Sequence, residues 1–437
     1  PRGAVAAAAS DARAPRRFFA ACAGGLEAAL ARELRDLGAQ DVREVSRGVN
    51  FRGGPRIGCR ALVLARTAAA VDEILTEAPQ PLTGREDLYN LVRGARDWAA
   101  SVPTQETLCV SAIVAGPDVA EDLRHTHYSA LMVCKAITDA CRDALGVRPS
   151  VDLNSPDWML NLVLHRGGAK LSRRWSGRGG LHRRGYRAGV KMHKAALRET
   201  VAAGLMLLAG VREGQPLALL DPMCGSGTLV LEAAMIAANV SPGAVREALI
   251  GPRGWHAVPA QFRDLLKEEL ELARARESVP AGLRLRGSDA HAGALALARR
   301  CVAALDSAAP GVGRAVSFEL RDAAEVEPDA GGHRRLLCCN PPWGARLDGT
   351  DDAEEDWPVD SREALHEAWR HLGDLLSRHR GDAWLLCPGE ISDELQKELA
   401  LAAGRSSSRH RVDGGPRQTE AKGALGLDWL RYDLRGR

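Results

Sequence analysis

The chain has 437 residues, an apolar content of 45% and a formal net charge of +3 at pH 7. This length fits two or three domains, and the near-balance of charge excludes a protein that is basic over its whole surface. No stretch approaches the roughly 18 consecutive apolar residues of a membrane-spanning helix, and the ten cysteines lack CxxC spacing, so we expect no membrane span and no disulfide framework but reduced thiols in an intracellular compartment.

The first 17 residues are rich in alanine and arginine and contain one carboxylate, Asp11. Such a composition is typical of an unstructured tail or of the remnant of an organelle transit peptide. Ordered structure is expected from Phe18, where a strand-like segment precedes apolar residues at helical spacing from Leu26 to Leu37. We expect the chain to act in the cytoplasm if its source is bacterial, and in a chloroplast or mitochondrion if it is eukaryotic.

A helix and two strands are predicted in the next part of the chain. Arg124–Ala140 begins as a polar turn and continues at helical spacing, and Leu160–Leu164 and Ala169–Ser172 suit strands. His125 and His127 form an HxH pair, but no Cys or His nearby completes a metal site. We therefore expect no bound metal.

A basic stripe follows, because no Asp or Glu occurs from Trp158 to Arg198. Its cations alternate with Trp175 and Tyr186, a combination that neutralises phosphates and offers flat faces to unpaired bases. The residues predicted to contact RNA are Lys170, Arg173, Arg174, Arg178, Arg183, Arg184 and Arg187. A solvated, glycine-rich linker would have the same composition.

The most informative motif is a glycine turn between a predicted strand, Leu217–Leu220, and an apolar helix that starts after Thr228. Gly225 and Gly227 let the backbone turn sharply and approach a ligand, and the free N–H groups at the helix start favour a carboxylate or phosphate. The lack of a third glycine at Rossmann spacing argues against a nicotinamide or flavin fingerprint, and the lack of Lys-Ser/Thr after the loop argues against a P-loop, whereas an ordinary tight turn stays open. The residues predicted to bind the cofactor here are Asp221, Pro222, Met223, Cys224, Gly225, Ser226, Gly227 and Thr228.

Two further strands end in carboxylates, since Leu283–Ser288 leads to Asp289 and Val316–Arg321 leads to Asp322. The interval before Asp289 is long because residues 240–282 form an insertion, which contains the sequence GPRGW at 251–255 and a charged helical stretch at 261–277. Nearer the end of the chain, apolar residues at 365–376 predict a helix, and the runs at 383–387 and 427–432 predict two strands.

A second motif follows the apolar run Leu336–Cys339 and therefore lies where a parallel strand ends, which is where ligands bind in open α/β sheets. Asn340 offers a side-chain carbonyl, Pro341 offers a backbone carbonyl, and Trp343, after Pro342, offers a flat stacking face. Two acceptors and a platform suit an exocyclic amino group on a heteroaromatic ring. A proline turn that only ends a strand would have the same sequence.

Taken in this order, DPMCGSGT and NPPW resemble the S-adenosylmethionine-dependent methyltransferases that modify an amino nitrogen of a nucleobase. Residues 124–187 are similar to the THUMP domain and linker of the bacterial 23S ribosomal RNA guanine-N2 methyltransferases, in which a ferredoxin-like region precedes THUMP. The resemblance extends from about Phe18 to about Leu434. It covers only the guanine-N2 half of those enzymes that carry a second methyltransferase behind it.

The resemblance implies an α/β fold, in which an α+β ferredoxin-like and THUMP module that binds RNA precedes a Rossmann-like, seven-stranded class I methyltransferase domain. It implies S-adenosyl-L-methionine as the cofactor, with Asp289 on its ribose hydroxyls and Asp322 on its adenine amino group, and a catalytic set of Asn340, Pro341, Pro342 and Trp343. The expected domains are a tail at 1–17, a ferredoxin-like region at 18–75, a THUMP-like domain at 76–165, a basic linker at 166–189 and the methyltransferase domain at 190–437.

The activity that the resemblance implies is methylation of the exocyclic N2 of a guanine in RNA, with large-subunit ribosomal RNA favoured. We expect direct in-line transfer that depends on positioning and oriented dipoles, without a strong general base or a metal. The alternatives are a transfer-RNA guanine-N2 methyltransferase, an adenine-N6 methyltransferase acting on RNA or DNA, and a catalytically silent RNA-binding assembly factor. The sequence leaves the target nucleotide and the oligomeric state open.

Overall fold

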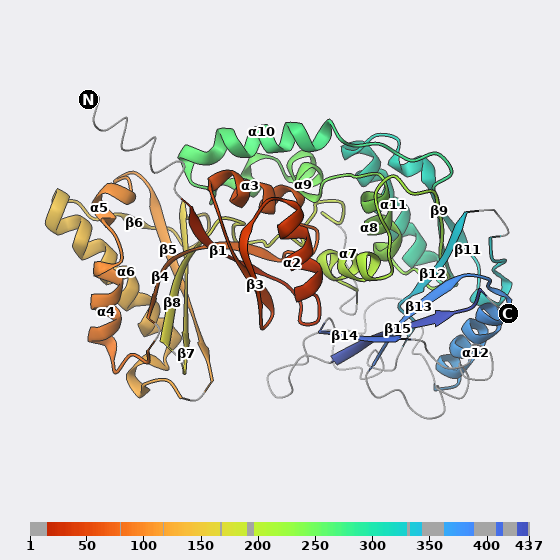
Figure 1. Ribbon diagram of the computed structural model, residues 1–437, viewed down its shortest axis with the longest axis horizontal. Helices are drawn as coiled ribbons and strands as arrows, with labels where there is room; N and C mark the ends of the chain where they lie inside the picture. Colours follow the sequence, from red (N-terminus) through yellow and green to blue (C-terminus); the bar gives the residue numbers. More distant parts are fainter. Residues whose placement is uncertain are drawn as a thin grey trace. The chain divides into compact units, whose positions relative to one another are not determined.

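The computed structural model describes residues 15–78, 80–116, 118–166, 168–189, 196–329, 333–342, 362–388, 408–413 and 426–435. The chain divides into two compact units (Figure 1). The first consists of Pro1–Ala21, Ala31–Leu181 and Ile250–Glu271, and the second consists of Cys22–Leu30, His182–Leu249 and Leu272–Arg437. Part of the insertion at 240–282 therefore belongs to the first unit.

The first unit is built on an eight-stranded sheet with the order β2-β3-β1-β4-β8-β7-β5-β6. Neighbouring strands are antiparallel except for β5, which is parallel to both β6 and β7. The strands are β1 (Arg16–Ala21), β2 (Gln40–Val45), β3 (Gly48–Gly53), β4 (Ala70–Ala78), β5 (Thr107–Ala115), β6 (Ser150–Val151), β7 (Trp158–His165) and β8 (Gly168–Arg174).

Helices cover this sheet because their apolar residues recur on one face. In α6 (Thr126–Leu145), Val133 and Ile137 are fully buried, and the helix belongs to a core that also contains Trp98 and Trp158, whose rings meet edge to face at 6.3 Å. The other helices of the N-terminal part are α2 (Glu27–Asp36), α3 (Pro55–Leu64), α4 (Arg85–Gly94), α5 (Trp98–Ser101) and the 3-10 turn η1 (Glu121–Leu123).

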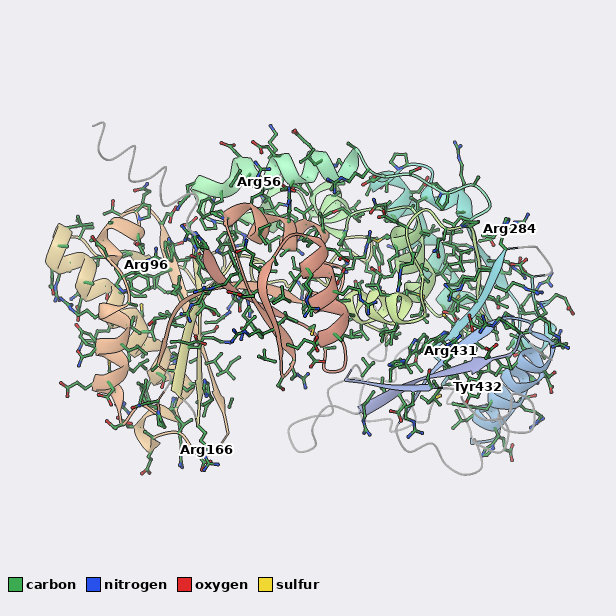
Figure 2. All side chains as sticks on the ribbon, viewed as in Figure 1. Arg56, Arg96, Arg166, Arg284, Arg431 and Tyr432 are labelled. Carbon is green, nitrogen blue, oxygen red and sulfur yellow. The ribbon has the colours of Figure 1, made fainter. Side chains whose placement is uncertain are left out.

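The insertion packs against α3 within the first unit. It forms the 3-10 turns η2 (Pro252–Trp255) and η3 (Ala260–Phe262) and the helix α10 (Arg263–Arg274). Arg56, which is labelled in Figure 2, donates a hydrogen bond to the α10 residue Glu269 at 2.7 Å, and Arg60 donates one to the same carboxylate at 2.9 Å. The ring of Phe262 lies 5.5 Å from that of Trp175. Because Glu269 and both rings are buried, this segment is an integral part of the first unit.

The second unit is built on a seven-stranded sheet with the order β11-β10-β9-β12-β13-β15-β14. The five strands from β11 to β13 are parallel, and β15 is antiparallel to both β13 and β14. The strands are β9 (Leu217–Asp221), β10 (Arg284–Asp289), β11 (Val316–Leu320), β12 (Arg334–Cys339), β13 (Asp382–Pro388), β14 (Ser408–Asp413) and β15 (Gly426–Asp433). The predicted α/β fold class and the predicted seven-stranded sheet are confirmed.

The central strand β9 is buried along its whole length, and so is the helix that follows it. The helices and 3-10 turns of this unit are α7 (Glu199–Leu208), α8 (Thr228–Ala237), α9 (Pro242–Ile250), α11 (Ala292–Ala308), η4 (Val312–Ala315), η5 (Ala323–Glu325) and α12 (Arg362–Arg378). Among the described residues no single helix is long and apolar enough to cross a membrane, and α8 and α9 meet that test only as a pair bent by 114°.

Candidate active site

The glycine turn joins β9 to α8 and has the local geometry that its sequence predicts. Gly225 and Gly227 have φ angles of +54° and +79°, in the left-handed region that favours glycine. A Cβ on Gly227 would lie 2.6 Å from the ring of Phe318, whereas a Cβ on Gly225 would meet no atom within 4 Å. Gly227 is therefore required for packing on β11, and Gly225 leaves open space over the loop.

Asp289, at the end of β10, is held directly against this loop. Its Oδ2 accepts a hydrogen bond from the Gly225 N–H at 2.8 Å, and its Oδ1 accepts one from the His291 N–H at 2.9 Å. The Cys224 N–H also donates to the Ser288 carbonyl at 2.9 Å. The structure thus brings together two predicted site segments that are more than 60 residues apart in sequence.

Asp221 ends β9 and is buried, with 2% of its surface exposed. Burial raises the pKa of its carboxyl well above the usual range, and the charge of Asp289 raises it further, while a hydrogen bond from the Met223 N–H at 3.3 Å opposes these effects. The carboxyl is therefore an interior group that shapes the turn.

Asp322 follows β11 and lies at the same edge of the sheet. Its Oδ1 accepts a hydrogen bond from the Ala324 N–H at 2.8 Å and lies 2.6 Å from Nδ1 of His371 on α12. Its predicted contact with an adenine amino group stays a prediction.

The second motif leaves the sheet beside the first. Strand β12 is parallel to β9 with Leu337 opposite Leu220, so Asn340 follows the end of β12 close to the point where Asp221 ends β9. Asn340 is partly exposed and Pro341 is buried. Trp343 lies outside the described residues, and its stacking role stays a prediction.

A hydrogen bond from α12 holds the Asn340–Pro342 turn in place. The indole N–H of Trp369 donates a hydrogen bond to the Pro342 carbonyl at 2.6 Å, and the Trp369 ring is fully buried. Trp369 is one of the apolar residues that predicted this helix, but its role as a donor to the second motif was missed, because a pattern of apolar residues does not show where an indole N–H points.

The predicted RNA contacts of several stripe residues are wrong, because these side chains are interior. Arg173 is 5% exposed, its guanidinium lies 3.7 Å from the centre of the Trp158 ring, and burial lowers its pKa to about 10. Arg184 is 1% exposed and lies 3.6 Å from Glu232. Trp175 and Tyr186 are also buried and cannot stack on bases.

Three other residues of the stripe contact side chains of the unit to which they belong. Arg174 forms a salt bridge with Asp72 at 2.9 Å, and the half-buried Lys170 lies over the ring of Phe19 at 4.1 Å. Arg187 contacts the glycine loop. Of the predicted set, Arg178 and Arg183 are exposed, and for these two RNA contact stays a prediction.

Arg187 is bound to the glycine loop, a contact that the sequence did not reveal. Its guanidinium donates hydrogen bonds to the hydroxyls of Ser226, at 3.3 Å, and Thr228, and to the Leu197 carbonyl at 2.8 Å. It also lies 3.6 Å from the carboxylate of Glu199, whose pKa is raised by burial. The last residue of the predicted RNA-contact set therefore supports the glycine loop.

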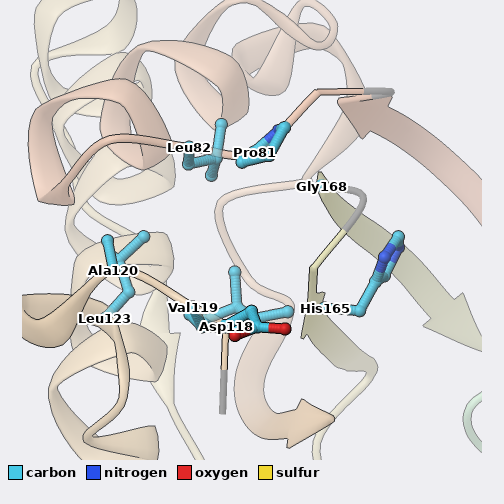
Figure 3. A pocket seen from close by; sticks show the side chains of 9 residues that line it. Pro81, Leu82, Asp118, Val119, Ala120, Leu123, His165 and Gly168 are labelled. Atoms are coloured by element: carbon cyan, nitrogen blue, oxygen red, sulfur yellow. The ribbon is translucent and has the colours of Figure 1, made fainter. Parts of the chain in front are cut away.

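A small pocket lies in the first unit, between the start of the α4 region and the turn before β8 (Figure 3). Its lining includes Pro81, Leu82, Val119 and Leu123, together with the polar residues Asp118 and His165. Both site motifs belong to the second unit, so this pocket is not part of the site. Among the described residues no group of three or more His, Cys, Asp or Glu is arranged to hold a metal.

Comparison with known proteins assigns three segments of the chain to protein families. Residues 17–71 match the RlmL ferredoxin-like domain, residues 85–173 match the THUMP domain, and residues 184–373 match the RMKL-like methyltransferase domain. Two solved structures have a similar fold at 20% identity, and each comparison covers 96% of this chain and 98% of the other. They are a protein from Clostridium difficile that is named a possible methylase, with a TM-score of 0.75, and a protein in complex with SAH that is named a putative methyltransferase, with a TM-score of 0.74.

Two relatives are more similar in sequence. The ribosomal RNA large subunit methyltransferase K/L of Syntrophotalea carbinolica is 36% identical over 401 residues, which are 89% of this chain and 51% of that protein, so the chain spans about half the length of this relative. A Synechocystis protein with the name of an RNA methyltransferase is 32% identical over 422 residues, 96% of this chain and 97% of that protein. The chain therefore belongs to the family of RMKL-like methyltransferases that carry ferredoxin-like and THUMP domains.

Proposed function

We propose that the chain is an S-adenosylmethionine-dependent methyltransferase that modifies the exocyclic N2 of a guanine in RNA, most specifically in large-subunit ribosomal RNA. The observation that carries this proposal is the exit of the glycine loop and the Asn340–Pro342 turn from the adjacent parallel strands β9 and β12. The family membership supports the reaction type, and the name of the Syntrophotalea carbinolica relative supports the choice of RNA.

The residues at the sheet edge fit the proposed cofactor. The open space over Gly225 leaves room for a ligand against the backbone, and the start of α8 favours the carboxylate of a methionine moiety. Asp289 lies beside this loop, where its carboxylate would accept hydrogen bonds from ribose hydroxyls. When bound, the cofactor would supply an electrophilic methyl group on a positively charged sulfur.

The second motif would hold the nucleophile. The Asn340 side-chain carbonyl and the Pro341 backbone carbonyl would accept the two N–H groups of the base, which turns the nitrogen lone pair out of conjugation and toward the methyl group. Because Trp369 fixes the Pro342 carbonyl, the acceptors would be held in place before the base arrives. The nitrogen would release one proton to water after transfer, and the rate would come mainly from orientation.

Nucleoside analysis of the product tests the proposal. The protein is incubated with unmodified ribosomal RNA and transfer RNA and with labelled S-adenosylmethionine, and the RNA is digested to nucleosides. N2-methylguanosine in large-subunit RNA is the expected product. N6-methyladenosine would show that the target base is adenine, and label in transfer RNA would show that transfer RNA is the substrate. If no RNA were labelled, the chain would be a catalytically silent RNA-binding factor.

A further inference from the structure

We propose that the insertion builds a phosphate-binding surface for RNA in the first unit, formed by Arg178, Arg253 and Arg263. This inference rests on the proposed function, because it names where part of the RNA substrate binds. It assigns a role to the GPRGW segment, which the proposed reaction itself does not use.

The GPRGW segment is a rigid turn. Gly251 has a φ of +77° and precedes Pro252, so a residue with a side chain would be strained there. The Gly254 N–H donates a hydrogen bond to the Gly251 carbonyl at 2.9 Å. Trp255 is buried, whereas Arg253 is exposed. The turn thus anchors its tryptophan in the first unit and leaves its arginine in solvent.

The turn places the three arginines near one another. His256 Nδ1 lies 2.8 Å from the Arg253 carbonyl, and Arg263 donates a hydrogen bond to the His256 carbonyl at 3.1 Å. A Cβ on Gly177 would lie 3.6 Å from His256 and 3.8 Å from the Gly254 carbonyl. The backbone just before Arg178 therefore runs along the turn.

Asp152 offsets part of the charge of this surface, at Arg178, whereas the described residues provide no ion-pair partner for Arg253 or Arg263. Arg178, Arg253 and Arg263 are exposed, and within the described ranges none of them forms an ion pair with a carboxylate. Residues 250–267 contain three cations, at 253, 263 and 267, and one carboxylate, Asp264. The Asp152 carboxylate accepts hydrogen bonds from the backbone N–H groups of residues 154 and 155, which lower its pKa, and the charges of Arg178 and His256 lower this pKa further.

This arrangement differs from that of the other arginines of the region. Arg56 and Arg60 pair with the buried Glu269 of α10, Arg56 also pairs with the exposed Glu268, and Arg174 pairs with Asp72. Guanidinium groups without a carboxylate partner are suited to bind phosphates through paired N–H donors. In a chain with a net charge of only +3, such a group of free cations at the surface favours a polyanion, and the family membership favours RNA.

The test compares two double variants that lose the same charge. Arg253→Gln with Arg263→Gln alters the proposed surface, and Arg284→Gln with Arg314→Gln is the control. Arg284 and Arg314 are exposed and lie at the amino ends of β10 and β11, at the edge opposite to the cofactor loop. The affinity for an unmodified large-subunit RNA transcript is measured by fluorescence anisotropy from 50 to 300 mM KCl.

Loss of two phosphate contacts should lower the slope of log K against log salt by about 1.4 to 1.8 and reduce affinity at least about tenfold at 100 mM. The control pair should keep the wild-type slope, and SAH affinity and Tm should stay unchanged in both variants. Arg253→Glu should weaken RNA binding more than Arg253→Gln does, because the introduced carboxylate repels the phosphates. If the two double variants had equal RNA affinities and equal salt slopes, the proposed phosphate-binding surface would be refuted. Failure of the wild-type protein to bind or methylate any RNA would instead contradict the proposed function.

Discussion

Replacing Arg187 with methionine would test whether the glycine loop is held for the cofactor by the segment before it. The variant keeps an extended side chain but loses the guanidinium contacts with Ser226, Thr228, Leu197 and Glu199. A hydrogen bond to a charged group contributes about 1.5–3 kcal/mol, and breaking a buried ion pair costs about 3–5 kcal/mol. Because burial raises the pKa of Glu199, this carboxyl can bind a proton when the cation is lost, so the total cost should stay near 3 kcal/mol, roughly the lower end of the ion-pair range.

We therefore expect the Tm to fall by about 6–12 °C, at roughly 2–4 °C per kcal/mol for a unit of this size. The Kd for SAH should rise by about 10- to 150-fold, which corresponds to one lost charged hydrogen bond. Thermal unfolding and isothermal titration calorimetry without RNA measure both effects. The control is Arg198→Met, since Arg198 is an exposed arginine just before α7.

Arg187→Lys keeps the positive charge and one donor, so it should recover part of the SAH affinity. If the Arg187→Met variant binds SAH as tightly as the wild type while its Tm falls, the contact serves stability alone, and the reasoning is refuted.

Three further predictions concern the same edge of the sheet. Asn340→Ala should slow single-turnover methyl transfer by about a hundredfold, because a preorganised acceptor is lost, and a normal rate would remove Asn340 from the mechanism. Trp369→Phe keeps a buried aromatic ring but removes the N–H that donates to the Pro342 carbonyl. Loss of this hydrogen bond, worth about 1 kcal/mol, should lower kcat by about fivefold or more and leave SAH affinity unchanged. A lower Tm with a normal kcat would show that Trp369 does not position the second motif. Burial raises the pKa of Asp221 in the folded state, so the stability of the wild type should fall as pH rises above about 4. The Tm of Asp221→Asn relative to that of the wild type should therefore increase from pH 4 to pH 8. A constant Tm difference would show that burial does not raise the pKa of this carboxyl.

The strands and turns of the site could be predicted because their signals are local. Strand β9 is a short apolar run, and the positive φ angles of its loop fall on glycines. The position of Asn340 at the ligand-binding edge followed from one topological rule, that parallel strands present their carboxyl ends at the same edge.

What could not be predicted depends on partners far apart in sequence. Arg184 can be buried because it lies beside Glu232, 48 positions later in the chain. The composition of the segment around Arg184 contains no carboxylate and therefore does not reveal this partner. Strand β14 was not predicted because its sequence, SRHRVD, has one strongly apolar residue, Val412, and it acquires its strand character by pairing with β15. The membership of residues 250–271 in the first unit was missed for the same reason.

The return of the chain to the first unit has a consequence for biosynthesis. Phe262 and Glu269 complete a core that otherwise closes near residue 181, yet they leave the ribosome only after β9 and α8. The amino-terminal unit thus cannot finish folding before the first strand of the catalytic sheet has emerged, although domains generally fold in the order of synthesis. A fragment that stops at residue 181 should expose the apolar surface around Trp175 and aggregate more readily than the full chain.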